Sequence, residues 1–338
     1  MKSVKLMKIS LIIVNHNGKK FIEKIIHTSL SQSYQAFELI VVDTNSTDNS
    51  IKTVKTKFPK VKIVEVDNKG FGFAANAGAK LAKGDFLMFF NEDMYLPKNF
   101  IETLVSFRKN LEKKFHSTIG AIGCKIIPFN SKPDNEPPNY GGKPDFLGFP
   151  TDVKNPDEIP FMINGCPFFI EKKLFLNTRG FNLNIFLYGE DEDICWRLNI
   201  FGYQHFVCND THLYHYGGGA INKNKEKKVA NVIAGPLIPV IMNYGNLILL
   251  IVTPIYLLYF LIINIGILLV TKFNLNYNIE IARVYLKIFR KLPSLLKFRS
   301  WVQKRRKVKD LQILKKISIV PAVLLNLSYK RLIKLDSK

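Results

Sequence analysis

The sequence is poor in cysteine, and its few cysteines form no pattern typical of a disulfide framework or a zinc ribbon. Four of the 338 residues are cysteine, they lie far apart, and none belongs to a CxxC pair. We therefore expect reduced thiols and a reducing compartment. We also expect no signal peptide, because the first apolar run, at residues 9–14, is too short for one and leads into polar residues.

Acidic residues are scarce in the last fifth of the chain, and the segment before it has no charge at all. The formal net charge is +22, and residues 272–338 supply +15 of it, with 18 Lys and Arg against 3 Asp and Glu. Residues 229–271 are uncharged, and Leu247–Val270 is long enough to cross a hydrocarbon core, which takes about 20 residues. We expect a hydrophobic membrane segment at 229–271 and a basic helical tail at 272–338. A buried helix of a soluble protein is the alternative.

How this segment meets the membrane stays open. Basic residues lie at 223–228 and at 272–338, so a single span would place one basic cluster outside, against the positive-inside tendency. Two short spans, a re-entrant hairpin bent near Pro254 and a helix in the interface are the other arrangements. We expect both flanks on the cytoplasmic side of the cell membrane, where the basic tail suits anionic membrane lipids. Nucleic acid is not expected as a partner, because no nucleic-acid-binding motif is present.

Short apolar runs alternate with amphipathic stretches in the first part of the chain. The runs are rich in Val, Ile and Phe, as buried parallel strands are, and the stretches between them have helical spacing. The predicted strands are residues 9–14, 37–42, 61–66 and 86–90, and the predicted helices are 21–30, 48–58 and 74–82. The alternation predicts an α/β fold with an open, mostly parallel sheet, whose ligands bind at the carboxyl ends of the strands.

Polar residues follow each of the four predicted strands. They are Asn15 and Asn17, then Asp43, then Asn68, and finally Asn91, Glu92 and Asp93. Carboxylates and amides at one sheet edge suit ribose hydroxyls, base N–H groups and a divalent cation. The alternative is that they are ordinary loop and capping residues, but four such groups on one predicted edge favour a binding site.

A glycine-rich segment offers a second interpretation of the same half. Residues 70–75 read GFGFAA, which satisfies the GxGxxA fingerprint of dinucleotide-binding proteins, and Asp93 follows at about the spacing of a ribose-binding acid. This is the argument for an NAD(P)-dependent oxidoreductase with a Rossmann domain. Two strand–helix units precede the segment, however, whereas the fingerprint normally follows the first strand. The glycines could instead allow close helix packing.

The second half contains a cluster of four carboxylates at residues 190–193. It follows a Pro- and Gly-rich stretch at 128–160, predicted to be a long loop, and an apolar strand predicted at 161–170. The four acids begin a predicted helix that runs to Phe201. Crowding of like charges raises carboxyl pKa values, which suits a general base. Arg197 lies four residues after Asp193 and could pair with it.

Several ordered motifs together resemble family 2 of the glycosyltransferases, especially its rhamnosyltransferase-like members. They are IIVNHNG (Ile12–Gly18), VVDTNSTDNS (Val41–Ser50), DNKGFGFAANAG (Asp67–Gly78), GDFLMFFNED (Gly84–Asp93), ING (Ile163–Gly165), FLYGEDEDICWR (Phe186–Arg197) and HYGGG (His215–Gly219). The resemblance spans about residues 8–245. It explains the GFGFAAN segment as a motif of this family, so a dinucleotide-binding site is not needed to account for it.

The resemblance implies a fold-A transferase that uses a nucleotide-diphosphate sugar. It implies that Asp43 contacts the nucleoside, that Asp93 with His215 holds Mg²⁺ or Mn²⁺, and that Asp191 is the catalytic base. The DxD-type metal signature reads Asn91-Glu92-Asp93 and so lacks its first acid. The expected donor site further includes Asn15, Asn17, Asn68, Asn76, Asn91 and Glu92, and the expected acceptor side includes Glu190, Asp193, Trp196 and Arg197.

The expected organisation is a catalytic domain at 1–228, with a nucleotide-binding half at about 8–115 and an acceptor half at about 116–228, followed by the membrane segment and the tail. We expect an inverting transfer of one or a few sugars to a glycan acceptor, lipid-linked through a polyprenyl chain, in cell-surface polysaccharide synthesis. No QxxRW element of processive synthases follows the acidic cluster. Besides the oxidoreductase, a non-catalytic membrane scaffold is an alternative, suggested by Asn91.

Overall fold

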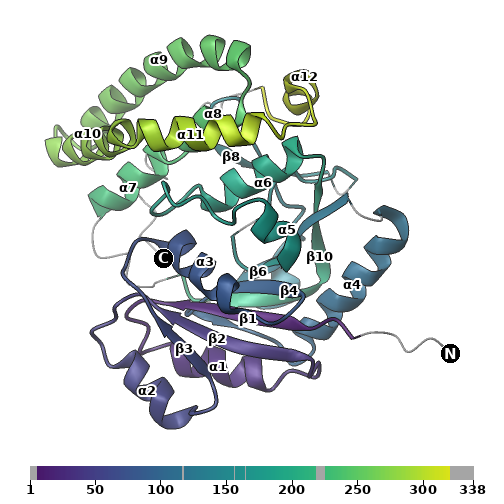
Figure 1. Ribbon diagram of the computed structural model, residues 1–338. Helices are drawn as coiled ribbons and strands as arrows, with labels where there is room; N and C mark the ends of the chain where they lie inside the picture. The colour runs from purple at the N-terminus through teal and green to yellow at the C-terminus, as the bar shows by residue number, and fades with distance from the viewer. Residues whose placement is uncertain (1–5, 116–117, 156, 164, 218–224, 320–338) are drawn as a thin grey trace.

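The computed structural model describes residues 6–115, 118–155, 157–163, 165–217 and 225–319, and its centre is an eight-stranded sheet (Figure 1). The strand order is β3-β2-β1-β4-β9-β6-β10-β5. The strands are β1 (Ile9–Asn15), β2 (Phe37–Asp43), β3 (Lys62–Glu65), β4 (Phe86–Asn91), β5 (Met94–Tyr95), β6 (Ile119–Pro128), β9 (Phe168–Glu171) and β10 (Gln204–His215). Asn164, residues 218–219 of the HYGGG motif and the end of the basic tail, residues 320–338, lie outside the described residues.

The sheet is mostly parallel. Strands β3, β2, β1 and β4 are parallel to one another, and β10 is parallel to β6. Strand β9 runs antiparallel to both β4 and β6, and β5 runs antiparallel to β10. The predicted α/β class with a mostly parallel sheet is therefore confirmed.

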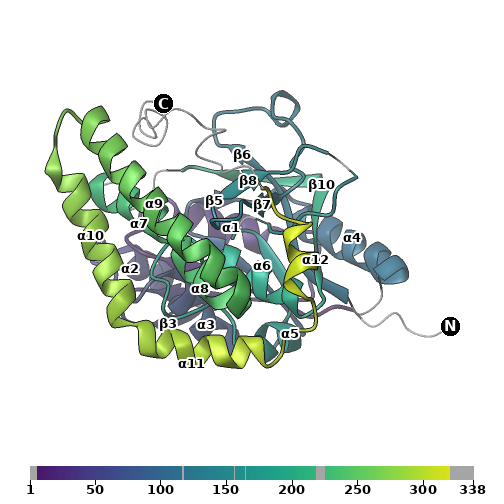
Figure 2. The ribbon, with the colours of Figure 1, turned by 90° about the horizontal axis from the view of Figure 1, so that it is seen from above.

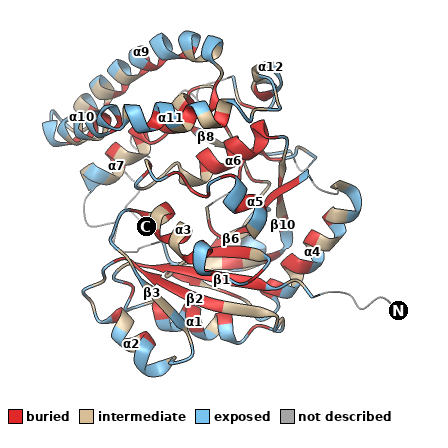
Figure 3. Ribbon diagram, viewed as in Figure 1, coloured by how far each residue is buried: buried red, intermediate tan, exposed pale blue. Residues whose placement is uncertain are grey.

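The central strands β1, β2 and β4 are buried on both faces along most of their length, which explains their nearly continuous apolar sequences. Because side chains alternate across a strand, Ile12 of β1 belongs to the core on one face while Leu11 and Ile13 belong to the core on the other. Helix α3 (Phe71–Leu81) packs on the first face, and α1 (Ile22–Leu30) and α4 (Phe100–Phe115) contribute to the second. Helix α2 (Ser50–Lys57) follows β2, and β1 and β2 are largely red with burial in Figure 3.

The segment predicted as one long loop and one strand differs in detail. Residues 128–160 contain a 3-10 turn, Pro133–Asn135, and a small hairpin of β7 (Gly142–Pro144) and β8 (Pro150–Asp152). The strand predicted at 161–170 begins only at Phe168. Pro167 has no N–H for a ladder, so the pairing of β9 starts after it. Helices α5 (Lys172–Asn177) and α6 (Glu190–Ile200) follow.

The uncharged segment divides into a buried part and an exposed part. Its first part, at 229–244, belongs to α7 (Lys225–Ala234) and α8 (Leu237–Asn243), whose apolar side chains lie in the core. Its second part is α9 (Asn246–Val270), the one helix of the described residues that is long and apolar enough to cross a membrane. The chain continues with α10 (Leu275–Arg290), α11 (Leu292–Gln303) and α12 (Asp310–Leu314). Figure 2 shows α9, α10 and α11 bordering one side of the molecule over α7 and α8.

Candidate active site

The carboxyl ends of the first strands bring their polar residues to one edge of the sheet. In the register of β1 and β2, Asn15 is opposite Asp43, and in the register of β1 and β4, Val14 is opposite Asn91. Asp43 is opposite Glu65 of β3. The polar groups that follow separate strands in the sequence are therefore neighbours in space.

Asp43 lies in a tight hydrogen-bond network. Asn15 Nδ2 donates to Asp43 Oδ1 at 2.7 Å and to Ser50 Oγ at 3.0 Å. The backbone N–H of Ser46 donates to Asp43 Oδ2 at 2.9 Å, and its hydroxyl donates to Oδ1 at 2.6 Å. Because Asn15 and Asp43 are both buried, these bonds fix the carboxylate at the base of the turn after β2.

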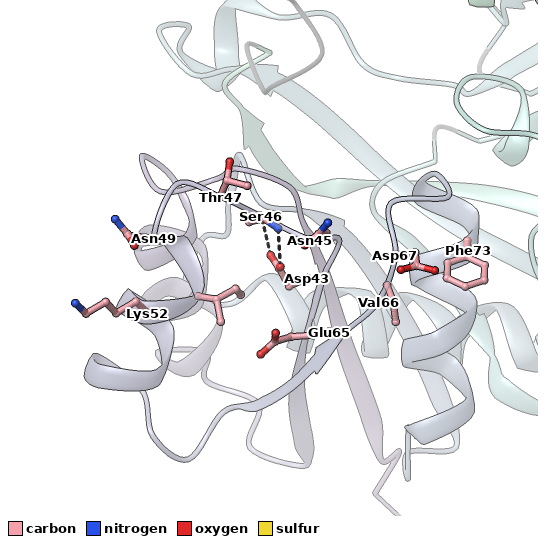
Figure 4. A pocket seen from close by; sticks show the side chains of 11 residues that line it. Asp43, Asn45, Ser46, Thr47, Asn49, Lys52, Glu65, Val66, Asp67 and Phe73 are labelled. Atoms are coloured by element: carbon pink, nitrogen blue, oxygen red, sulfur yellow. Dashed lines mark hydrogen bonds between the residues drawn. The ribbon is translucent and has the colours of Figure 1, made fainter.

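A groove of about 730 Å³ opens beside this network (Figure 4). Asp43, Glu65 and Asp67 supply carboxylates to it, Lys52 supplies a cation, and the ring of Phe73 forms part of its wall. Its walls come from the turn after β2, the start of α2, the end of β3 and the first turn of α3. The sequence analysis predicted Asp43 as a binding residue, but it did not predict Lys52 or Phe73. Lys52 and Phe73 lie inside amphipathic helices, and the sequence does not show which of their side chains point toward the groove.

The other predicted donor residues are placed differently. Asn17, with a positive φ of 52°, accepts the backbone N–H of Thr47 at 2.8 Å and so closes the turn after β2 onto β1. Asn68 is exposed beside His16. The side chain of Asn76 makes two hydrogen bonds to the backbone of Phe181. Asn76 Nδ2 donates to the carbonyl of Phe181 at 2.8 Å, and the N–H of Phe181 donates to Asn76 Oδ1 at 2.9 Å. The predicted donor contact of Asn76 does not fit, since its amide is used to attach α3 to the segment before α6.

A second cavity, of about 440 Å³, lies at the other end of the same edge. Four separate parts of the chain supply its polar lining. These are Asn91 of β4, Cys166 before β9, His215 of β10, and Glu190, Asp191 and Glu192 of α6. The remaining walls are mainly apolar.

Asp93 and His215 meet at the edge of this cavity. Strand β10 pairs with β5 so that His215 is opposite Met94, and the N–H of Tyr216 donates to the carbonyl of Asp93 at 3.0 Å. His215 Nε2 then lies 3.2 Å from Asp93 Oδ1. A carboxylate oxygen and an imidazole nitrogen are both suitable donors for Mn²⁺, and carboxylates suit Mg²⁺. Nowhere in the described chain do three His, Cys, Asp or Glu side chains converge as a metal-binding group.

Glu92 lies beside this pair and faces back toward β1. Burial, and secondly the neighbouring charge of Asp93, raise the pKa of Glu92 to about 8. A Cβ atom at Gly18 would lie 2.5 Å from Glu92 Cγ and 2.4 Å from Asn15 Oδ1. The loop after β1 therefore approaches this turn closely, which only a glycine at position 18 allows.

The carboxylates of α6 are separated by the rotation of the helix. Asp191 and Glu190 line the cavity, whereas Asp193 is fully buried in the core. Burial raises the pKa of Asp191, and burial together with the charge of Asp191 raises the pKa of Glu190 to about 8. The backbone N–H of Glu192 donates to Asp191 Oδ1 at 3.0 Å, which orients the carboxylate.

The predicted pairing of Asp193 with Arg197 is present, but it lies inside the protein. Arg197 Nε donates to Asp193 Oδ2 at 2.8 Å, and Arg197 Nη2 donates to the carbonyl of Gly180 at 2.8 Å. Trp196 packs edge-to-face against Phe161. The exposed fraction of Asp193, Trp196 and Arg197 is 0%. Their predicted contact with an acceptor therefore does not fit, because the helix turns these side chains into the core; Glu190 alone of the predicted acceptor residues faces the cavity.

Part of the chain is similar in sequence to known glycosyltransferases. The model of the family described as glycosyl transferase family 2 matches residues 10–174. An uncharacterized glycosyltransferase of Haemophilus influenzae is 33% identical over 103 residues, which are 29% of this chain and 41% of that protein. The chain spans less than half the length of the curated relatives that it matches.

Two solved structures share the fold. The crystal structure of GalNAc-T7 with UDP, GalNAc and Mn²⁺ has a TM-score of 0.54 at 19% identity, over 63% of this chain and 44% of that one. The mannosyltransferase PcManGT of Pyrobaculum calidifontis, in complex with GDP-Man and Mn²⁺, has a TM-score of 0.50 at 14% identity, over 89% and 86%. Residues 10–174, which carry Asn15, Asp43 and Asp93, match the model of glycosyl transferase family 2.

Proposed function

We propose that this protein is an inverting glycosyltransferase that moves a sugar from a nucleotide-diphosphate sugar to a glycan acceptor. The observation that carries the proposal is the common cavity of Asp191 and His215, with Asp93 in contact with His215. A candidate base thus lies across a cavity from two candidate metal ligands. The match of residues 10–174 to the family 2 model supports the same reaction class.

The groove beside Asp43 suits the nucleoside of the donor. A carboxylate fixed at the end of β2 can accept hydrogen bonds from base N–H groups or ribose hydroxyls, and the Phe73 ring offers a surface for stacking. UDP and GDP-Man occupy the two structures that share the fold. Asp43 is therefore assigned to donor binding, with Asn15 holding it in position, and Asn91 and Glu92 are assigned to the diphosphate end.

Asp93 and His215 would hold Mg²⁺ or Mn²⁺, with diphosphate oxygens and water as the remaining ligands. Both solved relatives were crystallised with Mn²⁺. The ion would supply positive charge that stabilises the departing diphosphate. The single carboxylate in this pair, with Asn91 in place of a second acid, predicts that the bound nucleotide itself contributes much of the metal affinity.

Asp191 is assigned as the base that accepts the proton of the attacking hydroxyl. Burial raises its pKa toward the pH at which such a base works best, and Glu190 beside it adds to the crowding of carboxylates. Attack in line with the departing diphosphate inverts the anomeric carbon. Glu190 is placed to hold a second hydroxyl of the acceptor.

A lipid-linked acceptor is supported by the walls of the cavity. Val232 of α7 and Pro236, just after α7, line it together with Asp191, and the other side of α7 is covered by α10. The reacting site is thus one helix layer from α10, which in turn contacts the apolar helix α9. We assign the protein to the cytoplasmic face of the cell membrane, as a rhamnosyltransferase-like hexosyl- or deoxyhexosyltransferase of cell-surface polysaccharide synthesis with a polyprenyl-linked glycan as acceptor.

The oxidoreductase alternative receives no support from the glycine-rich segment. A Cβ atom at Gly70 would lie 2.0 Å from the carbonyl oxygen of Phe186, and one at Gly72 would lie 2.8 Å from Phe181 Cβ. The two glycines therefore permit close packing of α3 against the segment before α6. A pyrophosphate site at the start of α3 does not fit this packing.

The proposal is tested by a thermal-shift screen of nucleotide diphosphates and nucleotide sugars with Mn²⁺, with NAD(P)H as the competing ligand. A ligand that binds only the native state increases the free energy of unfolding, by about 2.7 kcal/mol at a ligand concentration one hundred times Kd. The melting temperature rises as a result. We expect a shift with UDP, GDP or dTDP sugars and none with NAD(P)H. A second assay measures the release of nucleotide in the presence of a lipid-linked acceptor. An enzyme would release nucleotide, whereas a non-catalytic scaffold would bind the donor without releasing it.

A further inference from the structure

The side of α9 that faces away from the protein is a continuous apolar stripe. Leu250, Leu257, Leu261 and Ile265 lie on one side of the helix, with exposed fractions of 74%, 58%, 57% and 59%. We call these four residues the outer stripe. A continuous exposed apolar surface of this kind on a helix marks a contact with lipid or with another protein.

The opposite side of α9 is attached along the body of the protein. Its buried residues recur at helical spacing from Val252 to Ile267. The ring of Tyr259 lies 5.0 Å from that of Phe149, and the ring of Phe260 lies 4.7 Å from that of Tyr285 on α10. Helix α9 therefore lies against the surface of the protein, as Figures 1 and 2 show, with its outer stripe turned away.

Both ends of α9 are attached to the same body. At its start, Arg299 of α11 donates to Asn246 Oδ1 at 2.7 Å, and the N–H of Gly245 donates to Asp310 Oδ2 at 3.0 Å. Toward its end, Asn278 of α10 donates to the carbonyl of Asn264 at 3.0 Å. Helix α10 in turn packs against α7, which precedes α9 in the chain. A helix that crossed a bilayer would have its two ends on opposite sides, about 30 Å apart across the hydrocarbon core.

Exposed cations are concentrated in the segment that follows α9, on α10 and the start of α11. Between residues 272 and 297, six exposed basic residues stand against one acid, Glu280. They are Lys272, Arg283, Lys287, Arg290, Lys291 and Lys297. If α9 crossed the hydrocarbon, α10 would either lose its contact with α7 or carry Arg283 and Lys287 into the bilayer, where charged side chains are strongly disfavoured.

We propose that α9 lies in the plane of an anionic bilayer surface and does not cross it. The outer stripe enters the boundary between headgroups and acyl chains, to a depth of about 5–10 Å. The basic residues of α10 and α11 contact phosphate groups of the lipids. An exposed apolar helix in contact with the basic helix α10 matches the chemistry of an anionic phospholipid layer. This inference does not depend on which sugar the enzyme transfers.

The first experiment measures binding of the full-length protein to phosphatidylcholine vesicles with and without phosphatidylglycerol. We expect at least about tenfold tighter binding to the anionic vesicles, since each Lys or Arg near such a surface favours binding. The variant Leu257→Glu/Leu261→Glu should lose at least about tenfold of this binding. Its control is Leu30→Glu/Leu81→Glu, which adds the same charge at two exposed leucines outside α9. The thermal shift with a nucleotide sugar shows that each variant is folded.

The second experiment measures depth. Single cysteines at Leu250, Leu257, Leu261 and Ile265 are labelled with nitroxide, which is selective because the four native cysteines are all buried. An in-plane helix places the four labels at similar shallow depths. A depth that passes through a maximum near Leu257, with the ends of the helix at opposite surfaces, would overturn the proposal in favour of a span. Unchanged vesicle binding of Leu257→Glu/Leu261→Glu together with loss of a dimer would overturn it in favour of a second copy of the chain.

Discussion

His215 Nε2 lies 3.2 Å from Asp93 Oδ1, although one residue ends β10 and the other sits between β4 and β5. The antiparallel pairing of β5 with β10 creates this contact, because it sets His215 opposite Met94. The two side chains supply the carboxylate and the imidazole of the proposed metal site. Their proximity, more than their residue types, distinguishes them from the other histidines and acids of the chain.

Removal of either proposed metal ligand should weaken the binding of the metal ion. We expect His215→Ala to raise the Mn²⁺ concentration needed for half-maximal transfer by about tenfold or more. The measurement is transfer rate against Mn²⁺ concentration at saturating donor. His27→Ala is a suitable control, because His27 lies on α1, outside both cavities. An unchanged Mn²⁺ requirement in His215→Ala would remove His215 from the site.

The buried ion pair of Asp193 and Arg197 should support the fold of the acceptor half. Asp193→Ala leaves the Arg197 guanidinium unpaired at an exposed fraction of 0%, so we expect a loss of about 3–5 kcal/mol in the free energy of unfolding. Urea unfolding measures it. The control is the exposed pair of Lys57 and Glu23, which is also 2.8 Å long. Glu23→Ala should cost less than about 1 kcal/mol, and equal losses in the two variants would contradict this assignment.

His205 should make the protein less stable at mildly acidic pH. Burial lowers the pKa of His205 from 6.5 to about 4, and the ring is fixed between the carbonyl of Cys195 and the N–H of Ala121. Because the folded pKa is lower, the unfolded chain binds more protons between these values. The stabilisation is present above pH 6.5 and is lost as the pH falls toward 4.

From pH 7 to pH 5 this histidine alone should remove about 2 kcal/mol from the free energy of unfolding. Unfolding of the wild type and of His205→Gln at both pH values isolates the effect from the carboxylates, which titrate in both proteins. We expect a smaller decline in the variant. Parallel declines would show that the histidine is protonated in the folded state.

The first four parallel strands and the polar residues at their ends could be predicted, because local sequence determines both. Strand β6 was not predicted. Val- and Ile-rich runs such as residues 9–14 and 37–42 form the central strands, and the register of a parallel sheet brings Asn15 and Asp43 together. Strand β10 was not predicted, since Asn209, Asp210 and His212 interrupt its apolar pattern; the structure has a register irregularity there. Because β10 was not predicted, its pairing with β5, which brings His215 to Asp93, could not be predicted either.

The cluster at 190–193 shows the other limit of sequence reasoning. Four adjacent acids predict a helix start, but they do not show which of them faces a cavity. Successive residues of a helix are about 100° apart, so Asp191 faces the cavity while Asp193 lies in the core. The same rotation turns Trp196 and Arg197 inward, which explains why only Glu190 of the four predicted acceptor residues lines the cavity.

The rate of transfer should depend on pH through the protonation of Asp191. Burial raises the pKa of Asp191, and a base must be deprotonated, so activity should fall as the pH drops through that raised value. A plot of kcat/KM against pH for the wild type should therefore show an acid limb above pH 3.8. An acid limb at or below pH 3.8 would contradict the raised pKa of Asp191.

The most direct measurement compares Asp191→Asn with the wild type in donor binding and in transfer at neutral pH. The variant should give the wild-type thermal shift with the nucleotide sugar and Mn²⁺, because Asp191 lies outside the groove of Asp43. Its transfer rate should fall by about 10²–10⁴-fold, the range typical of a lost general base. Near-normal transfer by a variant that still binds donor would contradict the assignment of Asp191 as the base.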